Sequence, residues 1–469
     1  LFKDMACYQE EVRDPSRMAE VLNRVIEKAI RGSAPAQINV PRDYWTQVID
    51  IELPPIVRLE RQAGGVSAVS EAAKLLSNAK FPVILSGAGV VIGNAIEDCK
   101  KLAERLDAPV CSGYQHNDSF PGSHPLAVGP LGYNGSKAAM QLIAKADVVL
   151  ALGTRLNPFS TLPGYGIDYW PKQASIIQVD INSDRIGLAK KVTVGICGDA
   201  KLVAQQILEQ LSSSAGDKGR EERRALIHQT KSAWLQTLTS LDHEEDDPGT
   251  TWNKDSRERD PERMSPRVAW RAIQAGIPQD AIISSDIGNN CAIGNAYPTF
   301  EKGRKYLAPG LFGPCGYGFP SILGAKIGCP NTPVIGFAGD GAFGISMSEM
   351  TSCNRKEWPN ITMVIFRNYQ WGAEKRNSIL WYDNNFVGTE LDPELSYAKI
   401  AEACGSKGVE VKTPSELTEA IKTSCVEQQK GITTFIEVIL NQELGEPFRR
   451  DAMKKPVHVA GINSGDMQN

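Results

Sequence analysis

Short apolar runs alternate with amphipathic stretches along most of this 469-residue chain. Between residues 66 and 212 the pattern predicts helices at 67–77 and 95–106 and strands at 82–86, 109–111, 148–152 and 175–179. Between residues 265 and 469 it predicts strands at 281–285, 332–338, 361–366 and 433–440 and a helix at 346–355. Strands that alternate with helices form parallel sheets covered on both faces. The sequence therefore predicts an α/β fold of doubly wound parallel sheets.

Three other segments flank or separate these regions. Residues 1–50 contain one helical pattern at 15–30 and one short strand at 36–41, which cannot bury two faces, so we expect the rest of that domain to lie upstream. Residues 51–65 form a linker broken by Pro54-Pro55 and Gly64-Gly65. Residues 213–264 interrupt the alternation and become strongly acidic. We expect a charged surface connector there, with the cover of a site or an interface as the alternative.

Composition excludes several classes of function. The net charge of −4 gives no sign of a basic, nucleic-acid-binding domain. The most apolar stretch, 81–96, is too short and too interrupted to span a membrane. The ten cysteines include no Cys-Xaa-Xaa-Cys pair, and a chain of this length needs no disulfides, so we expect reduced thiols and a cytoplasmic protein.

The strongest chemical signal is Gly339-Asp340-Gly341-Ala342-Phe343, directly after an apolar strand. The next apolar strand ends just before Asn368, which lies 28 residues after Asp340. The carboxyl ends of parallel strands meet at one edge of a sheet, so both side chains are expected there together. Carboxylate and amide oxygens suit Mg²⁺, and flanking glycines and a helix start let backbone N–H groups approach a phosphate. Gly-Asp-Gly alone is typical of a tight turn, but the whole combination predicts a site for Mg²⁺ and a phosphate.

This block resembles the diphosphate-binding signature of thiamine-diphosphate (ThDP) enzymes. Three more segments resemble parts of the same family: 311–320 its Gly-rich segment under the cofactor rings, 283–290 its diphosphate loop, and 119–125 a turn of its central domain. Within the family, the segments 368–377, 443–452, 242–250 and 263–267 resemble the sulfoacetaldehyde acetyltransferases and are unusual for acetolactate synthases or pyruvate decarboxylases. The resemblance implies three domains: the end of a pyrimidine-binding domain at 1–50, a central domain at 62–212 and, after the connector 213–264, a diphosphate-binding domain at 265–469.

The resemblance also implies roles for individual residues. Mg²⁺ ligands would be Asp340, Asn368 and the backbone carbonyl of Gln370. The other cofactor contacts would be Gly288, Asn289, Gly313, Cys315, Gly339, Gly341 and Ala342, with Cys315 as the wedge that bends ThDP. Candidate contacts for anionic substrates are Lys375, Arg376 and Arg367. Arg367 stands where the family usually has Asn, and we expect either a surface charge or an anion contact.

The implied reaction converts sulfoacetaldehyde and phosphate to acetyl phosphate and sulfite through an enamine on ThDP, in a homo-oligomer (dimer or tetramer) with the active site at a chain interface. The family's activating Glu belongs to the early pyrimidine-binding domain and has no counterpart here, so we expect an N-terminally incomplete chain that is inactive alone. Three alternatives stay open. They are an acetolactate-synthase-like 2-oxoacid lyase, a non-catalytic ThDP-binding subunit, and a nucleotide-binding oxidoreductase supported only by Gly87-Ala88-Gly89.

Overall fold

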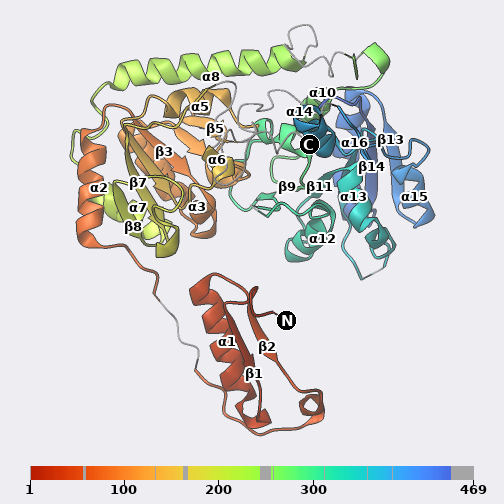
Figure 1. The fold of residues 1–469 in the computed structure, drawn as a ribbon, viewed down its shortest axis with the longest axis horizontal. Helices are drawn as coiled ribbons and strands as arrows, with labels where there is room; N and C mark the ends of the chain where they lie inside the picture. Colours follow the sequence, from red (N-terminus) through yellow and green to blue (C-terminus); the bar gives the residue numbers. More distant parts are fainter. Residues whose placement is uncertain are drawn as a thin grey trace. The chain divides into compact units, whose positions relative to one another are not determined.

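The computed structural model describes residues 2–55, 60–132, 134–161, 167–242, 255–256, 258–310, 312–355, 357–382 and 384–444. Most of the acidic part of the connector (243–254) and most of the segment 443–452 therefore lie outside the described residues. The chain divides into two compact units, Leu1–Glu60 and Arg61–Asn469 (Figure 1). Among the described residues, no helix is long and apolar enough to cross a membrane.

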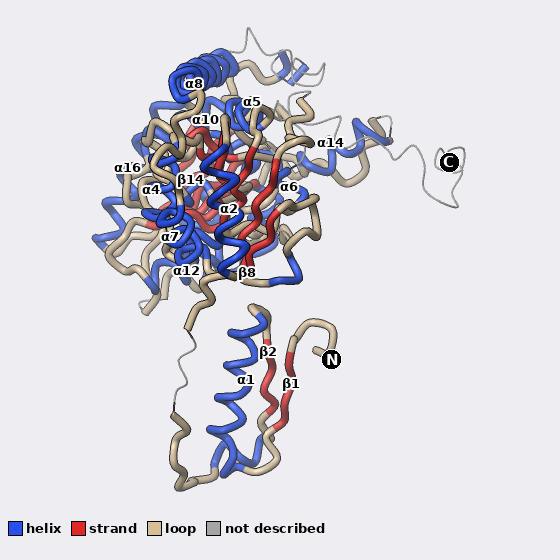
Figure 2. The backbone as a smooth tube through the Cα atoms, turned by 90° about the vertical axis from the view of Figure 1, so that its left-hand side faces the viewer, coloured by secondary structure: helices blue, strands red, loops and turns tan. Residues whose placement is uncertain are grey.

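The first unit is a small parallel α/β element. It contains β1 (Tyr8–Glu11), η1 (Pro15–Arg17), α1 (Met18–Gly32), β2 (Ala36–Asn39) and η2 (Arg42–Thr46). The two strands pair in parallel, and α1 lies along them (Figure 2), with a small core of Val12, Val21 and Val25. The predicted helix and strand are confirmed. Strand β1 was missed because its sequence, Tyr-Gln-Glu-Glu, is mostly polar.

The second unit begins with a six-stranded parallel sheet, β5-β4-β3-β6-β7-β8. Its strands are β3 (Pro82–Ser86), β4 (Val110–Ser112), β5 (Ala127–Pro130), β6 (Val148–Leu152), β7 (Ser175–Asp180) and β8 (Val194–Cys197). Its helices are α2 (Val66–Asn78), α3 (Ala88–Ile92), α4 (Ile96–Leu106), η3 (Asn117–Ser119), α5 (Lys137–Ile143), α6 (Pro158–Thr161), η4 (Ser183–Arg185) and α7 (Ala200–Gln210). Every residue of β3 and β6 is buried, as expected for central strands covered on both faces. The strand order reverses between these two strands, which makes their carboxyl ends a switch point of the sheet.

A second six-stranded parallel sheet, β10-β9-β11-β12-β14-β13, follows. Its strands are β9 (Ile282–Ser285), β10 (Tyr306–Leu307), β11 (Val334–Gly339), β12 (Thr362–Arg367), β13 (Lys407–Val411) and β14 (Thr434–Ile439). Its helices are α10 (Pro266–Gly276), α11 (Asn289–Ile293), η6 (Gly294–Ala296), α12 (Gly318–Gly328), α13 (Asp340–Ser346), η7 (Met347–Thr351), α14 (Gly372–Trp381), α15 (Tyr397–Ala403), α16 (Pro414–Glu427) and η8 (Gln428–Lys430). Successive strand residues enter two cores, for example Val364 on one face and Ile365 on the other. The predicted parallel α/β architecture is confirmed.

Two predicted elements differ from the structure. The helix expected at 346–355 is instead α13, which starts at Asp340, followed by the short helix η7. The chain turns directly from β11 into α13 because Gly339 is extended and Asp340 suits the first helical turn. The connector is not simply a charged surface segment, since it contains the 23-residue helix α8 (Arg220–Asp242).

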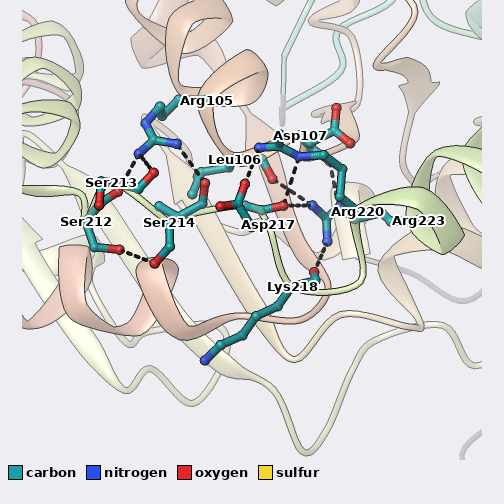
Figure 3. Close-up of polar contacts among 12 residues, drawn as sticks. Arg105, Leu106, Asp107, Ser212, Ser213, Ser214, Asp217, Lys218, Arg220 and Arg223 are labelled. Atoms are coloured by element: carbon teal, nitrogen blue, oxygen red, sulfur yellow. Dashed lines mark hydrogen bonds and ion pairs between the residues drawn. The ribbon is translucent and has the colours of Figure 1, made fainter.

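Helix α8 contacts α5 and α10, and so lies beside parts of both sheets (Figure 1). Its buried side chains recur every three or four residues: Arg223, Ile227, Thr230, Trp234 and Leu238. Arg223 fixes the start of α8 by donating to five backbone carbonyls, those of Lys80, Leu106, Asp107, Gly216 and Lys218, at 2.6–3.0 Å. Figure 3 shows Arg223 with Leu106, Asp107 and Lys218.

Candidate active site

The predicted pair Asp340 and Asn368 lies at the carboxyl edge of the second sheet. Strands β11 and β12 are neighbours, with Gly339 paired to Phe366, so the two segments after them leave the sheet side by side. Both side chains are buried, and the Tyr369 N–H donates to Asp340 Oδ2 at 2.7 Å. The other oxygen, Oδ1, accepts from the Gly341 N–H at 3.0 Å. The structure therefore brings the two predicted metal ligands together.

The Asp340 carboxyl is buried beside one cationic side chain, that of Arg367. Burial raises its pKa to about 6, although Arg367 and the N–H groups of Tyr369 and Gly341 act in the opposite direction. A carboxyl destabilised in its charged form by burial is stabilised again by a cation beside it. A divalent ion at this carboxylate would therefore favour the ionised form that a metal needs.

The other two predicted ligands also offer oxygens suited to Mg²⁺. The Asn368 side chain, 2 % exposed, has no hydrogen bond to any described residue. Gln370 is buried, and its side-chain Oε1 has no partner in the part of the chain that the structure describes. Between them Tyr369 has a φ of 60°, a left-handed conformation that is rare for an aromatic residue and is often found at functional sites. Carboxylate, amide and carbonyl oxygens are hard ligands, so the donor set fits Mg²⁺.

Arg367 is not a surface charge, and that alternative was wrong. Its side chain is fully buried, and its Nη1 lies 3.1 Å from Asp340 Oδ2. Its Nε lies 3.6 Å from Glu437 Oε1. The anionic groups that Arg367 contacts thus belong to the protein itself.

Lys375 and Arg376 lie near the start of α14, the helix after the predicted ligands, and both are buried. Lys375 Nζ forms an ion pair with Glu390, whose side chain is 57 % exposed. Arg376 Nη1 donates to Asn289 Oδ1 at 2.7 Å. Arg376 is thereby linked to a predicted diphosphate contact on a different loop.

The glycines of the predicted cofactor loops leave room beside the backbone. A Cβ at Gly288 or Gly339 would meet no described atom within 4 Å. Gly288 and Gly313 have φ values of 122° and 62°, which favour glycine. A Cβ at Gly341, in contrast, would lie 2.9 Å from the Trp371 ring. The loops thus have the open backbone that a bound diphosphate requires, and Trp371 packs against one of them.

Sequence reasoning missed Asp286, which joins two of these loops. Its Oδ1 accepts from the N–H groups of Ile287 and Gly316 at 2.8 and 3.1 Å, and its Oδ2 accepts from Gly318 at 2.6 Å. Burial raises its pKa despite these bonds. Its signal in the sequence is a lone carboxylate directly after an apolar strand. Glu437, inside the apolar strand β14, gives the same kind of signal and was also missed.

Cys315, the predicted wedge, is exposed in this chain. The pKa of its thiol is raised by partial desolvation and then by the charges of Asp286 and Glu374. Its Gly-rich segment is held to β9 through Asp286, so this segment and the loop after β9 lie together at one edge.

The Gly87-Ala88-Gly89 run in the first sheet packs against the backbone at the end of β6. A Cβ at Gly87 would lie 2.6 Å from the Gly153 carbonyl oxygen, and one at Gly89 would lie 2.7 Å from the Gly153 Cα. These glycines allow the ends of β3 and β6 to pack backbone against backbone. This packing accounts for the two glycines without a nucleotide, so the run gives the oxidoreductase alternative no specific support.

Comparison with known proteins agrees with this geometry. A family model described as "Thiamine pyrophosphate enzyme, central domain" matches residues 69–207, and "Thiamine pyrophosphate enzyme, C-terminal TPP binding domain" matches residues 286–438. Thiamine pyrophosphate is another name for ThDP.

Individual relatives narrow the family. The chain is 77 % identical over 468 residues to a probable sulfoacetaldehyde acetyltransferase of Rhizobium meliloti, a match that covers 100 % of this chain and 79 % of the relative. It is 72 % identical over 467 residues to the sulfoacetaldehyde acetyltransferase of Roseovarius nubinhibens, covering 100 % and 77 %. A probable acetolactate synthase large subunit of Methanococcus aeolicus is 28 % identical over 430 residues, covering 90 % and 70 %. The chain therefore belongs to the sulfoacetaldehyde acetyltransferases, within the thiamine pyrophosphate enzymes.

Proposed function

We propose that this protein converts sulfoacetaldehyde and phosphate to acetyl phosphate and sulfite, using ThDP and Mg²⁺. The observation that carries the proposal is the buried Asp340–Asn368 pair at the β11–β12 edge. It is supported by the 77 % identity of the chain to a probable sulfoacetaldehyde acetyltransferase. The acetolactate-synthase alternative has weaker support, at 28 % identity.

Mg²⁺ would be held by Asp340, the Asn368 amide oxygen and the Gln370 backbone carbonyl. The diphosphate would lie against the backbone of Gly288, Asn289, Gly339, Gly341 and Ala342, and the pyrimidine against Gly313 and Cys315. When bound, ThDP supplies a nucleophilic carbon and a sink for the electron pair of the aldehyde carbon, so that sulfite can leave and phosphate can accept the acetyl group. Asp286 would keep the Gly-rich segment and the diphosphate loop in register, because its carboxylate binds N–H groups of both.

Lys375 and Arg376 remain the proposed contacts for the sulfonate and phosphate groups. The Glu390 partner of Lys375 is 57 % exposed, so a substrate anion can replace it without leaving a buried, unpaired carboxylate. Arg376 has a planar guanidinium suited to paired hydrogen bonds with such oxyanions, and it already orients Asn289. Arg367 is a poorer substrate contact, since its guanidinium binds Asp340 and backbone carbonyls.

The expected domain limits, 1–50, 62–212, 213–264 and 265–469, belong to the same proposal, as do the homo-oligomer and the cytoplasmic location. Phe312, in the Gly-rich segment, is 93 % exposed. Large apolar groups at an active-site edge suit a contact with another chain. We therefore propose that a second copy covers this edge and contributes to the active site.

The test uses the protein produced from its complete gene, with ThDP, Mg²⁺, phosphate and sulfoacetaldehyde. Sulfite and acetyl phosphate are measured together, and we expect equal amounts of both, formed only when phosphate is present. Asp340→Ala should lower the rate at least about 1,000-fold, because it removes the only carboxylate of the proposed metal site. Asp280→Ala, an exposed carboxylate just before β9, is the matched control and should leave the rate unchanged. Consumption of pyruvate without sulfite release would favour the lyase instead.

A further inference from the structure

Arg367 is the centre of a buried charged cluster at the end of β12. Its side chain is 0 % exposed, and those of its two carboxylate neighbours, Asp340 and Glu437, are 1 % and 2 % exposed. The guanidinium also stacks near the rings of Tyr369 and Tyr397, at 4.2 and 5.4 Å from their centroids. Two carboxylates and one guanidinium leave the cluster with one excess negative charge, which is costly in a buried position.

The two oxygens of Asp340 have different surroundings. Oδ2 accepts from Arg367 Nη1 at 3.1 Å and from the Tyr369 N–H at 2.7 Å. Among the described residues, Oδ1 accepts only from the adjacent Gly341 N–H, at 3.0 Å. Arg367 and Tyr369 therefore bind one oxygen and leave the lone pairs of the other available.

Arg367 is itself fixed from the side away from Asp340. Its Nη2 donates to the backbone carbonyls of Asp392 and Leu395, and its Nε faces Glu437 Oε1. The second Glu437 oxygen accepts from Ser396 Oγ at 2.8 Å and from the Ala398 N–H at 3.0 Å. The guanidinium is thus held between the segment 392–398, strand β14 and Asp340.

The segment 392–398, which includes the start of α15, also contacts the backbone of Asp340. The Tyr397 hydroxyl donates to the Asp340 backbone carbonyl at 3.0 Å, so both the backbone and the side chain of Asp340 are tied to the same support. A ligand held by a hydrogen bond at its other oxygen has a fixed orientation, and loss of such outer partners commonly weakens metal binding 10–100-fold.

We propose that Arg367 is a positioning residue for the metal site: it holds Asp340 Oδ2 so that Oδ1 faces the divalent cation, and Glu437 keeps the guanidinium in place. The proposal rests on the Mg²⁺ site proposed above. A buried carboxylate in β14, that of Glu437, receives the guanidinium. The positioning effect should strengthen metal binding. The opposite effect on metal affinity is electrostatic repulsion between the Arg367 guanidinium and a bound cation.

The two effects have opposite signs in a binding experiment. The full protein is titrated with Mn²⁺ in the presence of ThDP, and free Mn²⁺ is measured by electron paramagnetic resonance. Arg367→Gln should raise the half-saturating Mn²⁺ concentration about 10–100-fold, and Arg367→Lys should restore part of the affinity, because it keeps the charge but loses the paired geometry. Glu437→Gln should cause a smaller rise and supplies the test if Arg367→Gln does not fold.

Arg223→Lys is the matched control, because Arg223 is also fully buried but its hydrogen-bond partners are backbone carbonyls outside the proposed cofactor loops. It should lower the melting temperature and leave the Mn²⁺ titration unchanged. Unchanged or tighter Mn²⁺ binding in the Arg367 variants overturns the inference and leaves the metal site intact. A wild-type protein without saturable Mn²⁺ binding, or equal binding by Asp340→Ala, overturns the proposed site itself.

Discussion

The two six-stranded sheets follow the same doubly wound plan, but their carboxyl edges differ. At the end of β3, Gly87 and Gly89 lie against the backbone of Gly153, where an added Cβ would clash. At the ends of β9 and β11, Gly288 and Gly339 face space that no described atom fills within 4 Å of an added Cβ. A glycine-rich turn after a parallel strand can thus serve backbone packing or leave room for a ligand. Which of the two it does depends on whether a neighbouring loop packs against the glycines.

Two fully buried arginines, Arg223 and Arg367, also differ in their partners. Arg223 joins α8 to the first sheet through five backbone carbonyls, which are uncharged partners. Figure 3 shows three of these partners, Leu106, Asp107 and Lys218. Arg367 binds Asp340 and faces Glu437, so it lies among groups whose charge can be shared with a cation. Arg223 is thus a packing contact beside the amino ends of β3 and β4, whereas Arg367 belongs to a carboxyl edge that is arranged around an incomplete charge balance.

The largest effect that tests this comparison is a matched pair of glycine substitutions. Gly89→Ala should lower the free energy of unfolding by about 3 kcal/mol, because its Cβ would meet backbone atoms that cannot move aside. Gly339→Ala should change it by less than about 0.5 kcal/mol, because the extended backbone accepts Ala and the space is open. Denaturant unfolding measures both.

A titration with ThDP should rank the two glycine variants in the opposite order, by loss of cofactor affinity. Gly339→Ala should weaken ThDP binding in the presence of Mg²⁺, whereas Gly89→Ala should leave it unchanged wherever the protein is folded. Equal losses of stability in the two variants would show that the edges do not differ in the way described.

The sequence predicted features that depend on one strand and on the residues directly after it. The apolar strands predict the parallel sheets, and Asp340 and Asn368 each come after such a strand, so their meeting at one edge required only the adjacency of β11 and β12. The partners of Arg367 were not predictable, because Glu437 lies 70 residues further along the chain and enters through the pairing of β12 with β14. Helix α8 was missed because its few buried residues stand among many charged ones, and only packing against α5 and α10 reveals its apolar face.

A smaller expected effect is the pH dependence of stability that His116 causes, beside the carboxyl edge of the first sheet. It lines a cavity of about 180 Å³ together with Arg155. Burial, and then the charge of Arg155, lowers its pKa from 6.5 to about 4. The unfolded chain therefore binds more protons between pH 6.5 and pH 4, and stability falls as the pH is lowered through that range.

We expect His116 to remove about 2 kcal/mol of stability between pH 7 and pH 5, and His116→Gln to abolish that part of the loss. Denaturant unfolding at the two pH values measures it. An equal loss of stability in wild type and variant would mean that His116 is accessible to water and that this edge is less tightly packed than the glycine contacts indicate.

The smallest expected effect is a difference in alkylation rate between an exposed and a buried cysteine of the second sheet's region. Cys315 is exposed but its thiol has a raised pKa, whereas Cys291 is buried and its pKa is raised to about 12. Iodoacetamide reacts with the thiolate. At pH 8 we expect slow alkylation of Cys315, increasing with pH above 9, and no alkylation of Cys291, as measured by peptide mass spectrometry.

The same reaction tests whether the open edge holds the cofactor. Addition of ThDP and Mg²⁺ should protect Cys315 several-fold in the wild-type protein and should not protect it in Asp340→Ala, because protection requires the bound diphosphate. Cys329, which is also exposed but lies after α12, is the internal control and should react at the same rate in both samples. Equal protection of Cys315 and Cys329 would indicate a general change of the protein rather than a ligand at this edge, and no protection at all would mean that Cys315 does not lie under the cofactor.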